Sequence, residues 1–232
     1  MKTFRWPLDL TLVAIFLVSA ALVLLTNEDP FFRSLICSAL PCPIVPQALR
    51  RVIYDLSIGS LVSLIFYWLI VRLPEYQRRQ RVKRSFAGRY RRFKEDCIGV
   101  MLGVADGTYD GSLVDELIEQ KKFRKYFTEN SDERWYRFLN KLDQRSLNEL
   151  KTFMEIFRDE IEFVLNTTTI PEDEPFEFLK RLSAAIRSLQ DTTLGYDETK
   201  PLENFLFEVF AGFNIVSGYA KQDVIETLIA SI

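Results

Sequence analysis

Two long apolar runs near the amino terminus constrain this chain more than any other feature. Leu8 to Leu25 is an 18-residue run with only three polar members, and Val52 to Leu73 is a second run interrupted mainly by Asp55, three serines and Arg72. About 20 apolar residues in a helix span the ~30 Å hydrocarbon core of a bilayer. Outside a closed barrel, only a helix satisfies its own backbone in lipid. The sequence therefore predicts transmembrane helices at 8–25 and 52–73.

A cleaved signal peptide is the other interpretation of the first run. The run exceeds the roughly 7–15 residues of a signal-peptide core, and Thr26-Asn27-Glu28 follows it without a small-x-small cleavage site. We therefore expect an uncleaved hairpin over residues 1–73 with an external loop at 26–51. Pro74 is expected to end the second span.

The distribution of charge predicts the orientation. The net charge of −2 combines +1 in residues 1–71 (5 basic, 4 acidic), +9 in 72–94 (10 basic, 1 acidic) and −12 in 95–232 (15 basic, 27 acidic). Basic residues next to a span stay on the cytoplasmic side. We expect a multi-pass protein of the cell inner membrane with its N-terminus and its C-terminal domain in the cytoplasm.

The basic segment 74–94 is expected to be a juxtamembrane connector that contacts anionic lipid headgroups. Its predicted lipid contacts are Arg78, Arg79, Arg81, Lys83, Arg84, Arg89, Arg91 and Arg92. The simpler alternative is a cluster that only fixes topology. Nucleic acid is disfavoured as a partner because the acidic residues 95–232 would repel its backbone.

Two features of the membrane segment suggest specific contacts. Cys37 and Cys42 lie in the external loop, where an oxidising exterior favours a disulfide; the alternative is two small apolar residues at the membrane surface. Asp55, Gly59 and Ser63 recur every four residues, so they form a stripe suited to helix packing or to lining a pore. The alternative is that Asp55 caps the start of its helix in the headgroup region.

Residues 95–232 are expected to form an acidic, all-α bundle of about six or seven helices. Apolar residues recur at helical spacing, as in Leu150, Phe153 and Phe157, and 206–216 is apolar nearly all round, which is typical of a central buried helix. Together with the hairpin, this makes the predicted fold class all-α. Cys97 is expected to be a reduced core residue.

One local motif resembles a known family. An apolar helix from Cys97 to Ala105 is followed by Asp106-Gly107-Thr108-Tyr109-Asp110-Gly111 and then by an acid-rich helix. Over residues 97–119 this is similar to the TerB-like tellurite-resistance domain, a family that is all-helical. The resemblance implies a metal site at Asp106, Asp110, Asp115 and Glu116.

The same turn matches an EF-hand loop only in its first half. Asp106, Thr108, Asp110 and Gly111 fit positions 1, 3, 5 and 6, but Leu117 stands where a bidentate glutamate belongs. The expected cofactor is therefore none, or a weakly bound divalent cation. An Asx turn that caps the following helix is the structural alternative.

The sequence contains no histidine and no phosphate-binding or nucleophile motif, which disfavours the commonest catalytic devices. We therefore expect a non-enzymatic membrane protein whose cytoplasmic helical domain binds or senses a protein partner in a stress-response or defence complex, with homo-oligomerisation as a second expectation. The alternative is an oligomeric two-span pore gated by its cytoplasmic domain.

Overall fold

The structure is a computed structural model that describes residues 6–26, 46–129, 134–168, 170, 172–195, 197–214, 218–220 and 222–231. The chain divides into two compact units, Met1–Arg78 and Arg79–Ile232, which we call the N-terminal and C-terminal units. The described residues are mostly helical, which confirms the all-α prediction. Their one departure is a ladder of two-residue strands.

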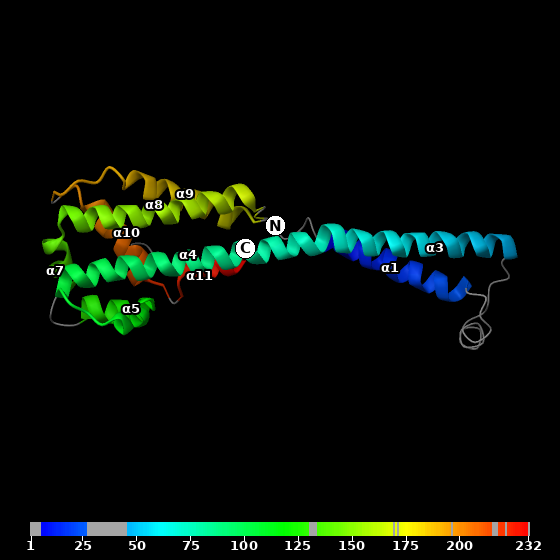
Figure 1. The fold of residues 1–232 in the computed structure, drawn as a ribbon, viewed down its shortest axis with the longest axis horizontal. Coiled ribbons are helices and arrows are strands. Elements are labelled where there is room, and N and C mark those ends of the chain that lie inside the picture. The colour runs from blue at the N-terminus through cyan, green and yellow to red at the C-terminus, as the bar shows by residue number, and fades with distance from the viewer. Residues whose placement is uncertain are drawn as a thin grey trace. The chain divides into compact units, whose positions relative to one another are not determined.

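The N-terminal unit consists of α1 (Trp6–Thr26), α3 (Gln47–Tyr67) and the π-helical turn η1 (Trp68–Arg72), which continues into α4. α1 packs beside α3 (Figure 1), and Ser19 Oγ donates a hydrogen bond to Ser60 Oγ at 3.2 Å. Ser19 and Ser57 are buried, whereas most large apolar side chains of both helices are exposed. The described side chains that are buried in this unit are therefore two small hydroxyl residues, not large apolar ones.

One described helix is long and apolar enough, by length and composition, to cross a membrane. It runs without interruption from Gln47 to Asp106 and contains the predicted second span. The apolar part described in α1, Leu10–Thr26, is shorter. This criterion supports association with a membrane and finds one candidate span where the sequence predicts two.

The helix that contains the second apolar run does not end at Pro74. α4 (Leu73–Asp106) begins directly after η1, and Pro74 lies in its first turn. Proline has no N–H to donate to the carbonyl four residues earlier. The π-helical turn at 68–72 provides a local change of hydrogen-bonding pattern directly before it.

The C-terminal unit surrounds α4 with seven further described α-helices and a second π-helical turn. They are α5 (Gly111–Leu117), α6 (Gln120–Arg124), η2 (Lys125–Glu129), α7 (Arg134–Lys141), α8 (Gln144–Thr167), α9 (Asp173–Ser188), α10 (Lys200–Ala211) and α11 (Val224–Ser231). Counted with α4, the described part of residues 95–232 holds eight α-helices, where six or seven are expected. The additional helix arises because a break at Ile118-Glu119 separates two short helices, α5 and α6.

Stacked aromatic rings join α4 to α8 in the core. The ring centroids of Phe93 and Phe157 are 4.7 Å apart, and Phe86 stacks on Phe157 at 6.0 Å. Val82, Phe86 and Tyr90 belong to the predicted connector but are buried here. The apolar face of this segment is therefore part of the core of the C-terminal unit.

The predicted helix 206–216 is too long. α10 ends at Ala211 because Gly212 adopts a left-handed conformation (φ 63°), which an L side chain rarely tolerates. The Gln120 amide lies where a β-carbon would stand and donates to the Val209 carbonyl at 2.9 Å. β1 (Phe213–Asn214) and β2 (Gly218–Tyr219) then pair antiparallel.

Candidate functional site

The predicted membrane stripe lies on the outer side of α3. Asp55, Gly59 and Ser63 are all exposed, and no atom comes within 4 Å of a β-carbon built on Gly59. Ser63 Oγ donates to the Gly59 carbonyl of its own helix at 2.8 Å. The side that faces α1 carries Ser57 and Ser60. The stripe therefore does not form the α1–α3 contact, and its surface is open within the described chain.

Part of the predicted lipid-contact set is exposed and free of carboxylate partners. Arg78, Arg81 and Arg84 follow one another at three-residue spacing on α4, and none makes an ion pair with a described carboxylate. Arg92 is likewise exposed without one, while Arg79 is half-buried. The guanidinium groups of Arg78, Arg81 and Arg84 are available to an anion from outside the described chain.

The remaining members of the set contact the C-terminal unit itself. Lys83 Nζ donates to the Ala230 carbonyl in α11, and Arg89 lies 3.9 Å from Glu160 of α8. Arg91 pairs with Glu95 at 2.8 Å and with Asp115 at 3.1 Å. The basic segment therefore contains residues with two different environments, which its sequence does not distinguish.

Asp106, the first predicted metal ligand, is surrounded by protein donors. The Tyr126 hydroxyl donates to Oδ2 at 2.8 Å, Arg137 donates to Oδ1 at 3.0 Å, and Arg134 lies 3.5 Å from Oδ2. Burial and the hydrogen bond to this carboxylate raise the pKa of Tyr126. Asp106 thus joins the end of α4 to η2 and α7.

The other predicted ligands are engaged elsewhere or exposed. Asp110 caps α5 by accepting from the Ser112 amide at 3.2 Å and from its hydroxyl at 2.8 Å, contacts that lower the Asp110 pKa. Asp115 pairs with Arg91, and Glu116 is exposed. No three histidine, cysteine, aspartate or glutamate residues of the described chain are grouped so that they could hold a metal ion.

A buried charge cluster, which the sequence interpretation missed, joins α4 to α11. Lys94 is 2% exposed and donates to Asp223 Oδ2 at 3.0 Å and to Glu226 Oε1 at 2.9 Å. The Tyr90 hydroxyl donates to the same Asp223 oxygen at 2.8 Å. Burial first, and then the charge of Asp223, raise the pKa of Tyr90 well above 10.0.

Two local features of the sequence indicate this cluster. Lys94 interrupts an apolar stripe that otherwise continues from Phe86 and Tyr90 to Met101, and a lysine in such a stripe requires a buried partner. Asp223 stands three residues before Glu226 at the start of an apolar run, which is typical of a helix N-cap. In the structure Asp223 Oδ1 accepts from the amides of Ile225 and Glu226 and so caps α11.

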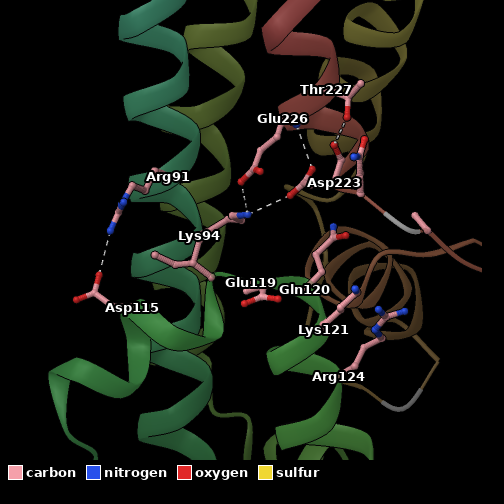
Figure 2. A pocket seen from close by; sticks show the side chains of 13 residues that line it. Arg91, Lys94, Asp115, Glu119, Gln120, Lys121, Arg124, Asp223, Glu226 and Thr227 are labelled. Atoms are coloured by element: carbon pink, nitrogen blue, oxygen red, sulfur yellow. Dashed lines mark hydrogen bonds and ion pairs between the residues drawn. The ribbon is translucent and has the colours of Figure 1, made fainter.

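The cluster forms one wall of a cleft of about 630 Å³ between α4, the α5–α6 segment and α11. Figure 2 shows the charged side chains of all three segments around it, with Lys121 and Arg124 on α6 across from Asp223 and Glu226. The lining residues are Arg91, Lys94, Asp115, Ile118, Glu119, Gln120, Lys121, Arg124, Ala220, Gln222, Asp223, Glu226 and Thr227. Three segments of the C-terminal unit thus contribute charged side chains to one cleft, and its volume falls in the range of roughly 300–1,000 Å³ that is typical of ligand sites.

The predicted disulfide cannot be placed, because Cys37 and Cys42 lie outside the described residues. Cys97 is a free thiol buried in the core, as expected from the sequence, and burial raises its pKa. Comparisons of the chain with family models, with curated proteins and with solved structures find no match.

Proposed function

We propose that this protein is a non-enzymatic, multi-pass protein of the cell inner membrane. Two spanning helices would hold the acidic helical domain in the cytoplasm, where it binds a protein partner or senses a signal in a stress-response or defence complex. The observation that carries this proposal is the exposure of large apolar side chains along α1 and α3, among them Leu17 at 61% and Leu56 at 75%. Water-soluble proteins rarely expose contiguous apolar surfaces of this extent.

The length of α1 supports a second span. Its 21 residues at about 1.5 Å per residue give roughly 31 Å, which matches the hydrocarbon core. Its packing beside α3 suits a helical hairpin, and the Ser19–Ser60 hydrogen bond is of the kind that joins helices in lipid.

Arg78, Arg81 and Arg84 are the residues of the basic segment best suited to contact anionic headgroups. They are exposed, lack described carboxylate partners and lie within 12 residues after Arg72, near the end of the predicted span. Attraction to an anionic surface is worth about 1 kcal/mol for each such residue. We assign Arg89 and Arg91 mainly to contacts within the C-terminal unit.

Topology mapping tests the membrane assignment. All three cysteines are changed to serine, and single cysteines are then placed at Ser38 and at Tyr76. With an impermeant maleimide on intact cells, we expect labelling at position 38 alone, and labelling at position 76 only after lysis. Labelling of both positions from the outside, or release of the protein by alkaline carbonate, would overturn the two-span arrangement.

The alternative function is an oligomeric pore. It is favoured by the exposed stripe of Asp55, Gly59 and Ser63 on α3, which leaves a carboxylate and an open surface within an apolar helix. A second copy could pack there with Asp55 facing a water-filled path. Planar-bilayer recordings decide this case: a pore gives discrete conductance that Asp55→Asn alters, whereas the binding protein gives none.

A further inference from the structure

The carboxylates of the cleft in Figure 2 have partners within the protein. Asp115 lies 3.1 Å from Arg91, and Asp223 and Glu226 both accept from Lys94. Glu119 lies 3.8 Å from Lys122, which stands outside the cleft. Each acidic side chain of the lining therefore has a cation beside it.

Two cations of the lining lack such a partner. Lys121 and Arg124 lie one turn apart on α6, and neither pairs with a carboxylate of the described chain. The Arg124 guanidinium lies over the Tyr219 ring, 4.5 Å from its centroid, which restricts its position. An anionic group entering the cleft would therefore find two cations that are not engaged in an ion pair with a described carboxylate.

We propose that this cleft binds a small, soluble phosphorylated ligand that also carries hydroxyl groups, a nucleotide or a sugar phosphate. Lys121 and Arg124 bind the phosphate by charge-assisted hydrogen bonds. Glu226, which is 59% exposed and uses one oxygen for Lys94, accepts from a ligand hydroxyl across the cleft. The volume of about 630 Å³ admits a molecule of this size.

The proposal goes beyond the membrane function and does not depend on it, because every residue that it uses lies in the C-terminal unit. A phosphorylated inositol lipid headgroup carries the same two groups, phosphate and hydroxyl. We propose the soluble ligand and not the lipid headgroup, and the experiment compares nanodiscs with and without phosphoinositide.

The test uses the full chain in phosphatidylcholine nanodiscs and isothermal titration with ATP, ribose 5-phosphate, inorganic phosphate and ribose. We expect saturable one-site binding of ATP or ribose 5-phosphate, with weaker binding of phosphate and of ribose. The double variant Lys121→Gln/Arg124→Gln should weaken this binding about tenfold or more. Glu226→Gln should remove the preference for ribose 5-phosphate over inorganic phosphate.

The matched control is Lys125→Gln/Lys151→Gln, which removes the same charge outside the cleft and leaves the partners of the cleft carboxylates in place. It should leave the affinity within about twofold, since such charges away from the cleft are screened by salt. Unchanged melting temperatures establish that each variant is folded. The proposal is overturned if no probe binds below about 10 mM, if the control weakens binding as much as the cleft variant, or if binding occurs only in nanodiscs that contain phosphoinositide.

Discussion

The two units of this protein place apolar side chains in opposite ways. In the N-terminal unit, Val13, Leu17 and Leu56 are more than half exposed, and the buried described side chains are two serines. In the C-terminal unit, Phe123, Phe138 and Phe157 are buried to 1% exposure or less. The helices differ in composition as well, because α1 and α3 are largely apolar whereas α8 and α9 carry many charged residues. Helical structure alone does not reveal which solvent a helix meets, but the apolar composition and the outward-facing apolar side chains of α1 and α3 together suit lipid.

The basic segment shows the same contrast within one helix. At one end of α4, Arg78 and Arg81 are exposed without a described ion pair; further along, Lys94 is enclosed with Asp223 and Glu226. The net charge of the segment does not distinguish these exposed residues from the buried lysine. The partners of Lys94 lie 129 and 132 positions away in the sequence, which makes the difference a product of tertiary packing.

The largest expected effect separates buried from exposed phenylalanines on α8. Phe157→Ala should lower the free energy of unfolding of the C-terminal unit by about 3–5 kcal/mol, because it removes a buried ring that packs against Phe86, Tyr90 and Phe93. Phe163→Ala, on the same helix but 50% exposed, should cost less than about 1 kcal/mol. Urea unfolding in detergent measures both; equal losses would contradict the assigned core.

The second prediction concerns the buried lysine. Lys94→Met should destabilise the C-terminal unit by about 3 kcal/mol or more, because it leaves the 6%-exposed Asp223 carboxylate without its cation. Lys122→Met is the control, since its pair with Glu119 is exposed and worth at most about 1 kcal/mol. If the two variants melt at the same temperature, the Lys94 cluster does not stabilise the fold.

The third prediction tests the outward-facing apolar surface. Val62→Lys, near the middle of the predicted second span and 45% exposed, should impair membrane insertion by about 2.5–3.5 kcal/mol. Ile156→Lys, which is 43% exposed on α8, should have little effect on insertion or on folding. The measurement is the fraction of protein that resists carbonate extraction, and full resistance of the Val62 variant would argue against a lipid-facing surface there.

A smaller effect is expected at alkaline pH. Because the folded-state pKa of Tyr90 is raised above 10.0, its contribution to stability is complete below pH 10 and is lost as the pH rises from 10 toward the raised value. Tyr90→Phe should cost about 1 kcal/mol at pH 7 through the lost hydrogen bond to Asp223 and should flatten the alkaline decline. Melting temperatures at pH 7 to 11 measure this. Buried Cys97 titrates in the same direction, so Cys97→Ala is the companion variant.

The smallest expected effect is that of divalent cations. Asp106 accepts from Tyr126 and Arg137, so Mg²⁺ or Ca²⁺ at millimolar concentration should change the melting temperature by less than about 1 °C. Asp106→Asn should instead weaken the fold with or without cations. A cation-dependent rise in melting temperature that Asp106→Asn abolishes would restore the metal hypothesis implied by the TerB-like resemblance.

Local signals predicted much of the helical structure but not all helix ends. The apolar spacing of Leu150, Phe157 and Ile161 gave the buried face of α8 correctly. The helix continues through Pro74, directly after a π-helical turn. The helix predicted to extend beyond Ala211 ends there because Gly212 adopts a left-handed conformation against Gln120. Neither outcome follows from a residue type alone.

The sequence by itself determined that the chain is helical, that two apolar runs precede an acidic region, and that a basic segment lies between them, because periodicity and composition are local properties. Only the tertiary structure decided which basic residues are free, that Asp106 has protein partners, and that Lys94, Lys121 and Asp223 line one cleft. Ion pairing and burial depend on atoms brought together from distant positions, and pattern along the chain does not specify those distances.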